Sequence, residues 1–188
     1  DAVKKNAKIV AVTSGGALGQ AAKNIVIIPG GLQPRAALGY LFFPLLGVLA
    51  NSNIADVNSG EITEMLSVLS KTNEFKNVGQ KIANKINGKI PIIYASELLS
   101  SVAYRWKTQF NENSKSPAFS NVFSEMNHNE IAGYQTMNKN NFISIFIRDE
   151  RNNDRVKKRM DITKEIISTK ADVEEILTKG NSLLARMF

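Results

Sequence analysis

One stretch decides the fold class: Lys8-Ile9-Val10-Ala11-Val12-Thr13-Ser14-Gly15-Gly16-Ala17-Leu18-Gly19-Gln20-Ala21-Ala22. Its first six residues are typical of a β-strand, the glycines of a tight turn, and the last six residues of a short helix. A second strand is expected over residues 24–28. Both runs are apolar throughout and do not alternate with polar residues, which is typical of a parallel sheet covered on both faces. The stretch therefore predicts an α/β fold.

A turn-rich loop then leads into a helix. The loop is Pro29-Gly30-Gly31-Leu32-Gln33-Pro34, and its last proline suits the first turn of a helix expected over residues 35–50. Arg35 would thus lie at a junction between strand, loop and helix. The apolar part, residues 36–50, is shorter than the roughly 20 residues that cross a membrane, and Pro44 lies inside it. We expect a buried, kinked helix and no membrane partner.

The polar residues 51–60 mark a domain boundary, which divides the chain into residues 1–55 and residues 56–188. Helical periodicity predicts two helices next, over residues 62–69 and 75–86. A strand is expected at residues 90–94, followed by a helix with Ser96 as its N-cap and an apolar stripe that ends at Phe110. A short helix around residues 119–126 and a strand at residues 141–147 follow. Both ends look like parts of helices, so we expect a fragment of a longer chain.

The composition limits the chemistry that the chain can perform. Its 188 residues are 43% apolar and 22% charged, which is enough for a buried core, and they include no cysteine and one histidine. Disulfides, thiolate metal sites and multi-histidine metal centres within one chain are therefore excluded, and we expect no metal and no cofactor. The N-terminus lacks the apolar core of a secretion signal, which favours a cytoplasmic location.

The formal charge of +7 indicates anionic partners, which could be nucleic acid, a membrane surface or a phosphorylated metabolite. The densest basic run is residues 151–159, but acidic residues interrupt and flank it, and it contains no aromatic residue. Surfaces that bind nucleic acid normally show an uninterrupted basic stripe or an aromatic stacking platform. We therefore interpret the run as a solvated helix face and expect no nucleic-acid partner.

Two polar segments supply a candidate acid and base: Asn111-Glu112-Asn113-Ser114-Lys115 and Glu125-Met126-Asn127-His128-Asn129-Glu130. Glu112 lies where a predicted helix ends, and a carboxylate there can accept a proton. His128 is the only histidine, its charge changes near neutral pH, and Asn127, Asn129 and Glu130 could fix its tautomer. The alternatives are that Glu112 is merely solvated, that His128 is structural, or that Glu130 is the acid or base in place of Glu112.

Several motifs together resemble one enzyme family. They are Thr13-Ser14-Gly15-Gly16, Pro29-Gly30-Gly31-Leu32-Gln33-Pro34-Arg35-Ala36-Ala37-Leu38-Gly39-Tyr40, and the segments of Glu112 and His128. In this order they are similar to the bifunctional phosphoglucose/phosphomannose isomerases of archaea and some bacteria, over essentially the whole chain. The resemblance implies two sugar isomerase (SIS) domains, each a parallel sheet flanked by helices. Residues 1–55 would be the C-terminal part of the first SIS domain, and residues 56–188 the second, incomplete at its C-terminus.

The same resemblance implies an activity and roles for three residues. Family members interconvert fructose 6-phosphate with glucose 6-phosphate and mannose 6-phosphate through an enediol. Glu112 would be the base that moves a proton between C1 and C2, and Arg35 would lie beside the sugar and stabilise the enediolate. His128 would help to open the ring from the neighbouring subunit of a homodimer, and no metal is implied. The family's phosphate-binding loops would precede Asp1, and a lysine used in ring opening would follow Phe188.

Some alternatives stay open at this point. Arg35 could be a surface cation, and Ser14-Gly15-Gly16 could cradle an anion, although so short a motif favours a simple turn. The alternative function is a non-catalytic, sugar-phosphate-binding regulatory module of the same fold, which would need no base. An isomerase of amino sugars is less consistent with the sequence, because the cysteine nucleophile of its usual glutamine-hydrolysing domain is absent.

Overall fold

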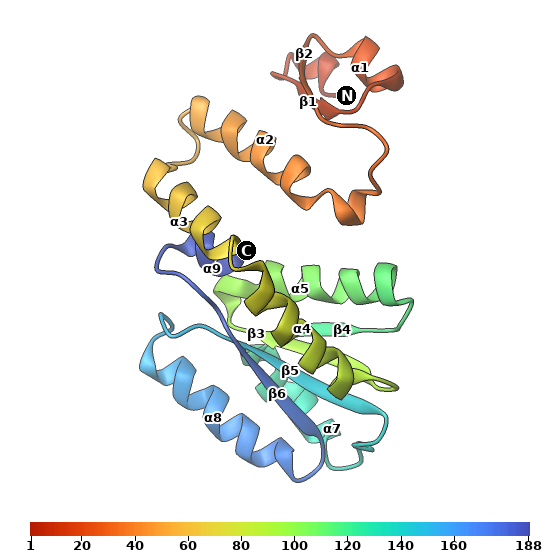
Figure 1. Cartoon of the computed structure of the whole chain (residues 1–188), viewed down its shortest axis with the longest axis vertical. Coiled ribbons are helices and arrows are strands. Elements are labelled where there is room, and N and C mark those ends of the chain that lie inside the picture. The colour runs from red at the N-terminus through yellow and green to blue at the C-terminus, as the bar shows by residue number, and fades with distance from the viewer. The chain divides into compact units, whose positions relative to one another are not determined.

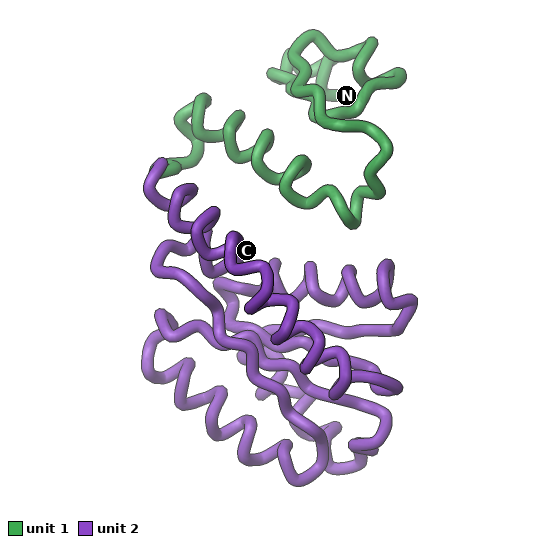
Figure 2. Tube along the Cα trace, viewed as in Figure 1, with its two compact units in different colours: residues 1–58 green, residues 59–188 purple.

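The computed structural model describes all 188 residues and divides them into two compact units, residues 1–58 and residues 59–188 (Figure 2). The predicted domain boundary, between residues 55 and 56, lies just before this division. The assignment of unit 1 to a first SIS domain stays a prediction.

Unit 1 contains the arrangement of strand, turn, helix and strand that the opening stretch predicts. Strands β1 (Val10–Thr13) and β2 (Asn24–Ile27) pair in parallel, and helix α1 (Gly16–Ala21) connects them. The turn before α1 requires glycine because Gly15 and Gly16 have φ values of 134° and 68°, which other residues rarely adopt. The remaining elements are η1 (Val3–Lys5), the 3₁₀ turn η2 (Pro34–Ala36) and helix α2 (Leu38–Asn51).

Burial in unit 1 differs from the sequence-based expectation. The sequence predicts strands covered on both faces and a buried helix over residues 35–50, yet Ile27 is 66% exposed and Leu45 of α2 is 53% exposed. The physical reason is that a two-stranded sheet has too little surface to form a core by itself. The helix also begins later than predicted, after η2, and continues through Pro44.

Unit 2 is a four-stranded parallel sheet, in the order β4-β3-β5-β6, flanked by helices (Figure 1). This arrangement confirms the predicted α/β class. Its elements, in chain order, are α3 (Ser59–Leu69), α4 (Thr72–Ile86), β3 (Ile90–Ala95), η3 (Glu97–Leu99), α5 (Ser100–Gln109), η4 (Phe110–Ser114), β4 (Phe119–Val122), α6 (Phe123–Glu125), η5 (Met126–Glu130), α7 (Ile131–Gly133), β5 (Phe142–Arg148), α8 (Asp154–Ser168), β6 (Asp172–Leu177) and α9 (Leu183–Met187).

The sheet of unit 2 builds an apolar layer on each face, because successive side chains of a strand point in opposite directions. Ile93 and Ile145 pack with α4 and α5 on one face, whereas Tyr94 and Phe146 pack with α6, η5 and α8 on the other. All four side chains are at most 1% exposed, and burying an Ile or a Phe contributes roughly 1.5–3 kcal/mol. In Figure 1, α5 lies above the strands, α4 crosses in front of them, and α8 lies below them.

The predicted short helix over residues 119–126 is partly wrong. Residues Phe119–Val122 form the edge strand β4, which pairs with β3, and the helical segment starts only at Phe123. Two of the four residues of β4, Ser120 and Asn121, are polar, so pairing with β3 and not local propensity makes this segment a strand. The helices expected over residues 62–69 and 75–86 and the strands expected at 90–94 and 141–147 are confirmed as α3, α4, β3 and β5.

Candidate active site

The two predicted catalytic side chains lie in the two π-helical turns of the chain. Glu112 belongs to η4, which continues α5, and His128 belongs to η5, which follows α6. Backbone hydrogen bonds in a π-helix reach from residue i to i+5, and such turns are rare and are often found at functional sites. Both turns are therefore candidate sites on backbone geometry as well as on residue type.

The turn η4 holds Glu112 at the surface. Trp106 and Phe110 pack against the core, with their ring centroids 6.4 Å apart, and so fix the end of α5. Lys115 ends the turn in the left-handed conformation, with φ of 54°, and its Nζ donates a hydrogen bond to the Glu112 carbonyl oxygen at 2.6 Å. The side chain of Glu112 itself is exposed.

The turn η5 has one buried end and an exposed centre. Met126, its first residue, is fully buried beside Phe123 and Phe146. His128, two residues later, is exposed. The imidazole thus lies at the surface of a turn that starts in the apolar core.

One chain does not bring Glu112 and His128 into contact. Phe110 in η4 packs on the face of the sheet that is covered by α4 and α5, whereas Met126 in η5 packs on the opposite face. In addition, η4 precedes β4 and η5 follows it, so the turns lie toward opposite ends of that strand. A single site that uses both side chains would therefore draw them from two copies of the chain.

Glu130, the last residue of η5, anchors the turn to the sheet. Tyr94 OH of β3 donates to Glu130 Oε2 at 2.8 Å, and Asn121 Nδ2 of β4 donates to Glu130 Oε1 at 2.6 Å. Tyr134 OH donates to Tyr94 OH at 3.2 Å and lies 2.7 Å from Ser144 Oγ of β5. Both tyrosines are at most 3% exposed, and burial raises the pKa of each hydroxyl group. The hydroxyl groups therefore remain protonated and can donate toward the carboxylate.

The sequence suggests that Asn127, Asn129 and Glu130 fix the tautomer of His128, but each of these side chains bonds elsewhere. Asn127 bonds to α8, Asn129 Nδ2 donates to Glu125 Oε1, and both oxygens of Glu130 accept hydrogen bonds from the sheet. This arrangement does not present the Glu130 carboxylate to a substrate. The geometry therefore favours a structural role for Glu130 over its alternative role as acid or base.

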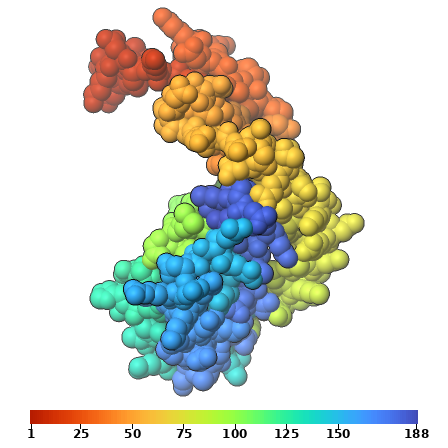
Figure 3. All heavy atoms as spheres, turned by 90° about the vertical axis from the view of Figure 1, so that its left-hand side faces the viewer, coloured from red at the N-terminus to blue at the C-terminus, as the bar shows by residue number.

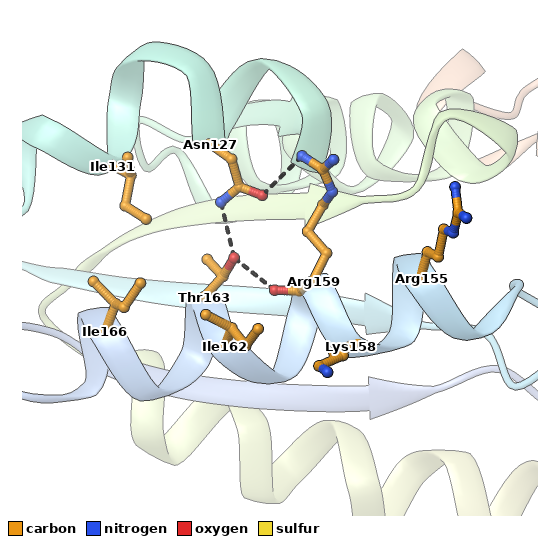
Figure 4. A pocket seen from close by; sticks show the side chains of 8 residues that line it. All are labelled: Asn127, Ile131, Arg155, Lys158, Arg159, Ile162, Thr163 and Ile166. Atoms are coloured by element: carbon orange, nitrogen blue, oxygen red, sulfur yellow. Dashed lines mark hydrogen bonds between the residues drawn. The ribbon is translucent and has the colours of Figure 1, made fainter.

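A groove of about 440 Å³ lies beside η5, between α7 and α8 (Figure 4). Asn127 extends from η5 toward α8, where its Nδ2 donates to Thr163 Oγ1 at 2.8 Å and its Oδ1 accepts from Arg159 Nη1 at 3.4 Å. Thr163 Oγ1 in turn donates to the carbonyl oxygen of Arg159 at 2.8 Å. These bonds link the residue before His128 to the middle of α8.

In the folded protein, the charged side chains of the basic run, residues 151–159, that lie on α8 occupy different places on the helix. Asp154 pairs with Lys157 at 2.9 Å, and the cations that line the groove are Arg155, Lys158 and Arg159. All three are exposed, and Figure 3 shows the outer side chains of α8 at the surface. The structure therefore agrees with a solvated helix face, although its cations gather along one groove.

In unit 1, Arg35 lies in η2, directly after the glycine-rich loop, and is partly buried. Also in unit 1, the Ser14-Gly15-Gly16 segment forms a closed turn, because Thr13 Oγ1 donates to the Gly15 carbonyl oxygen at 2.8 Å and accepts from Gly15 N at 3.1 Å. This geometry agrees with the turn interpretation of the motif. The role of Arg35 toward a substrate stays a prediction.

Sequence reasoning missed the polar groups that hold η5. Ser144 gave the clearest available signal, because it is a polar residue inside the apolar strand segment Phe142-Ile143-Ser144-Ile145-Phe146 and is fully buried. A buried hydroxyl group needs a hydrogen-bond partner, which here is Tyr134. No group of three or more carboxylate or imidazole side chains is arranged to hold a metal ion, and none of the helices is both long and apolar enough to span a bilayer.

The chain is similar to known proteins both in sequence and in fold. Residues 75–188 match the family described as the bacterial phospho-glucose isomerase C-terminal SIS domain. The whole chain is 42% identical to the bifunctional phosphoglucose/phosphomannose isomerases of Thermoplasma acidophilum and Caldicellulosiruptor bescii, and it spans 59% and 60% of their lengths. Among solved structures, glucosamine-6-phosphate deaminase from Thermotoga maritima has the same fold, with a TM-score of 0.71 and 14% identity over 98% of this chain and 58% of that protein.

These similarities cover the same features that the sequence motifs indicate. The matched domain contains the parallel sheet of unit 2 and both π-helical turns. The identity to the two isomerases extends through unit 1 as well. The chain therefore belongs to the phosphoglucose/phosphomannose isomerase family.

Proposed function

We propose that the protein is an aldose–ketose isomerase that interconverts fructose 6-phosphate with glucose 6-phosphate and with mannose 6-phosphate. The observation that carries this proposal is the 42% identity, across the whole chain, to two bifunctional isomerases. Because the chain spans about 60% of their lengths, the activity is proposed for the full gene product.

An enediol intermediate accounts for both products with one base. Removal of a proton from C1 of open-chain fructose 6-phosphate, with protonation of O2, gives the enediol. Protonation of C2, with loss of the O1 hydroxyl proton, then gives the glucose or the mannose epimer, according to which face of the enediol is turned toward the base. We assign this transfer to Glu112, because one carboxylate at the surface of a turn can serve two neighbouring carbons. Arg35 is the proposed partner of the enediolate, since a guanidinium group keeps its charge while a proton moves nearby.

His128 is the proposed group for opening the sugar ring, acting in the site of a second copy of the chain. Ring opening moves a proton between the anomeric hydroxyl group and the ring oxygen, and an imidazole can accept and donate protons near neutral pH. The separation of η4 and η5 on opposite faces of the sheet supports a homodimer in which η5 of one copy faces η4 of the other.

The test is turnover of fructose 6-phosphate by the full gene product, with separate detection of glucose 6-phosphate and mannose 6-phosphate. We expect both products. Binding of fructose 6-phosphate without turnover would contradict the isomerase and favour the regulatory module. Formation of glucose 6-phosphate alone would contradict the bifunctional activity.

A further inference from the structure

His128 is exposed, yet the residues around it are held inside the fold. Met126 is fully buried in the apolar layer under η5. Asn127 is bonded to Thr163, and Glu130 is bonded to Tyr94 and Asn121. The imidazole therefore projects from a turn that is fixed on both sides of it.

We propose that Glu130 is a positioning residue, whose carboxylate fixes the π-helical turn η5 against strands β3 and β4 and thereby sets the place of the His128 imidazole. This proposal rests on the proposed function of His128 in ring opening. Glu130 acts through the backbone of the turn and not on the substrate, because both of its oxygens face partners inside the fold.

The site of Glu130 requires two hydrogen-bond acceptors. Val122 N donates to Asn121 Oδ1 at 2.8 Å, which fixes the orientation of that amide and leaves its NH₂ group toward Glu130. Tyr94 OH is also a donor toward Glu130, because it accepts a hydrogen bond from Tyr134. A carboxylate supplies both acceptors, whereas a glutamine would place its own NH₂ group against a donor.

A chain of hydroxyl groups extends this anchor across the sheet. Since Tyr134 OH donates to Tyr94 OH, its oxygen accepts from Ser144 Oγ, so the donors run from Ser144 through Tyr134 and Tyr94 to Glu130. Ser144, Tyr134 and Tyr94 are at most 3% exposed, so water cannot readily replace these bonds. Hydrogen bonds that end on an ionised carboxylate are also stronger than neutral ones.

Asn127, the residue directly before His128, provides a second anchor, and Figure 4 shows its side chain extending toward α8. Its amide joins η5 to Thr163, which is 2% exposed, and to Arg159. Only His128 and Asn129 lie between the two anchored residues. The backbone at position 128 therefore has little freedom to shift while both anchors hold.

The first variant is Glu130→Gln in the full gene product, assayed with fructose 6-phosphate. We expect kcat to fall about 10–100-fold, because a displacement of the order of 1 Å can cost about 100-fold in rate, and KM to change less than about three-fold. Glu125→Gln is the matched control, since it also removes a carboxylate close to His128 in the sequence, but from a side chain bonded only to Asn129. Its kcat should stay within about two-fold of the wild-type value.

The rescue variant combines Glu130→Gln with Asn121→Asp. The introduced aspartate would accept from Val122 N and from the new amide, and the glutamine oxygen would accept from Tyr94 OH, so the donors and acceptors match again. We expect this pair to recover kcat to within about five-fold of wild type. A residue needed only for its negative charge next to the substrate would not be rescued in this way.

A second readout is independent of turnover. In the NMR spectrum of the full gene product, the imidazole resonance that disappears in His128→Ala is assigned to His128. We expect this resonance to shift or broaden in Glu130→Gln, to stay unchanged in Glu125→Gln, and to return in the rescue variant. If Glu130→Gln does not fold, Tyr94→Phe removes one of the two bonds and serves as the milder variant.

The outcomes separate this proposal from the proposed function. Absence of turnover in the wild-type protein would overturn the isomerase, while the resonance would still test the anchor. An unchanged resonance in Glu130→Gln would overturn the anchor. A shifted resonance with unchanged kcat would overturn its role in positioning His128 for catalysis.

Discussion

The turns η4 and η5 have the same helical type but are held in different ways. The bonds of η4 that involve Asn111, Asn113 and Lys115 all reach residues within five positions along the chain. By contrast, η5 is bonded to Tyr94 and to Thr163, each 36 residues from its partner in the turn. The polar side chains Asn111, Asn113 and Lys115 around the proposed base therefore bond locally, whereas the turn that carries the proposed ring-opening group is bonded to a distant strand and a distant helix.

The largest expected effect comes from Glu112→Gln. The amide is nearly isosteric but cannot accept the proton, so kcat for fructose 6-phosphate should fall about 10²–10⁴-fold while substrate binding is largely retained. The free energy of unfolding should hardly change, because Glu112 is exposed. Turnover assays and urea denaturation measure the two quantities. Retention of most of the turnover rate would eliminate Glu112 as the base.

The next largest effect should come from His128→Ala. We expect loss of rate on the cyclic substrate of about 10²-fold, and a clearly smaller loss on an open-chain substrate analogue, because only the ring form needs the imidazole. Steady-state kinetics with both compounds makes the comparison. If His128→Ala lowered the rate equally with the cyclic substrate and with the open-chain analogue, His128 would have no role in ring opening.

Tyr94→Phe tests how strongly η5 is held. Removal of the hydroxyl group leaves a Glu130 oxygen without its donor, and we expect the free energy of unfolding to fall by about 1–3 kcal/mol. Urea denaturation measures this change. A loss below about 0.5 kcal/mol would show that the hydroxyl chain contributes little to the fold.

The pH dependence of the free energy of unfolding also tests how firmly the buried hydroxyl groups of Tyr94 and Tyr134 hold η5. Burial raises the pKa of Tyr94 and of Tyr134, so the folded state holds these protons more tightly than the unfolded state does. The resulting stability is complete below the unfolded tyrosine pKa of about 10 and is lost as the pH rises above it. Between about pH 9 and pH 11 the free energy of unfolding, measured by urea denaturation, should therefore fall further in the wild type than in Tyr94→Phe, by about 1.3 kcal/mol. If the free energy of unfolding changed with pH equally in the wild type and in Tyr94→Phe, the burial of the Tyr94 hydroxyl group would not contribute to the pH dependence of stability.

The smallest effect is expected in η4. Asn113→Ala removes a side chain that bonds to Gln109 on the exposed side of the turn. The free energy of unfolding should change by less than about 0.5 kcal/mol, as is usual for surface substitutions. A loss as large as that of Tyr94→Phe would show that η4 is held as firmly as η5 and would remove the contrast between the turns.

Local patterns in the sequence were sufficient for much of the fold. The run of Val10 to Thr13 with the glycines after it predicted β1, the turn and α1, and helical periodicity predicted α3 and α4. The position of Glu112 at the end of α5 also followed from the apolar stripe that ends at Phe110. These features depend on residues close together in the chain, which a sequence displays directly.

The features that were missed depend on distant residues. The strand β4 exists because β3 offers it a pairing edge, and its polar residues give no strand pattern. Glu130 looked like an alternative acid or base, since nothing near it in the sequence reveals that Tyr94 will bond to it. The exposure of Ile27 likewise depends on how few strands unit 1 contains. In each case the deciding contact is absent from the local sequence.

The separation of Glu112 and His128 on opposite faces of the sheet leads to the most direct test of the account. Glu112→Gln and His128→Ala proteins, each nearly inactive, would be mixed in equal amounts, dissociated and reassembled. If each active site draws its base from one copy and its imidazole from the other, half of the dimers regain one intact site, and about one quarter of the wild-type turnover of fructose 6-phosphate should return. Activity no greater than the sum of the two variants alone, in a mixture shown to contain mixed dimers, would contradict the shared site.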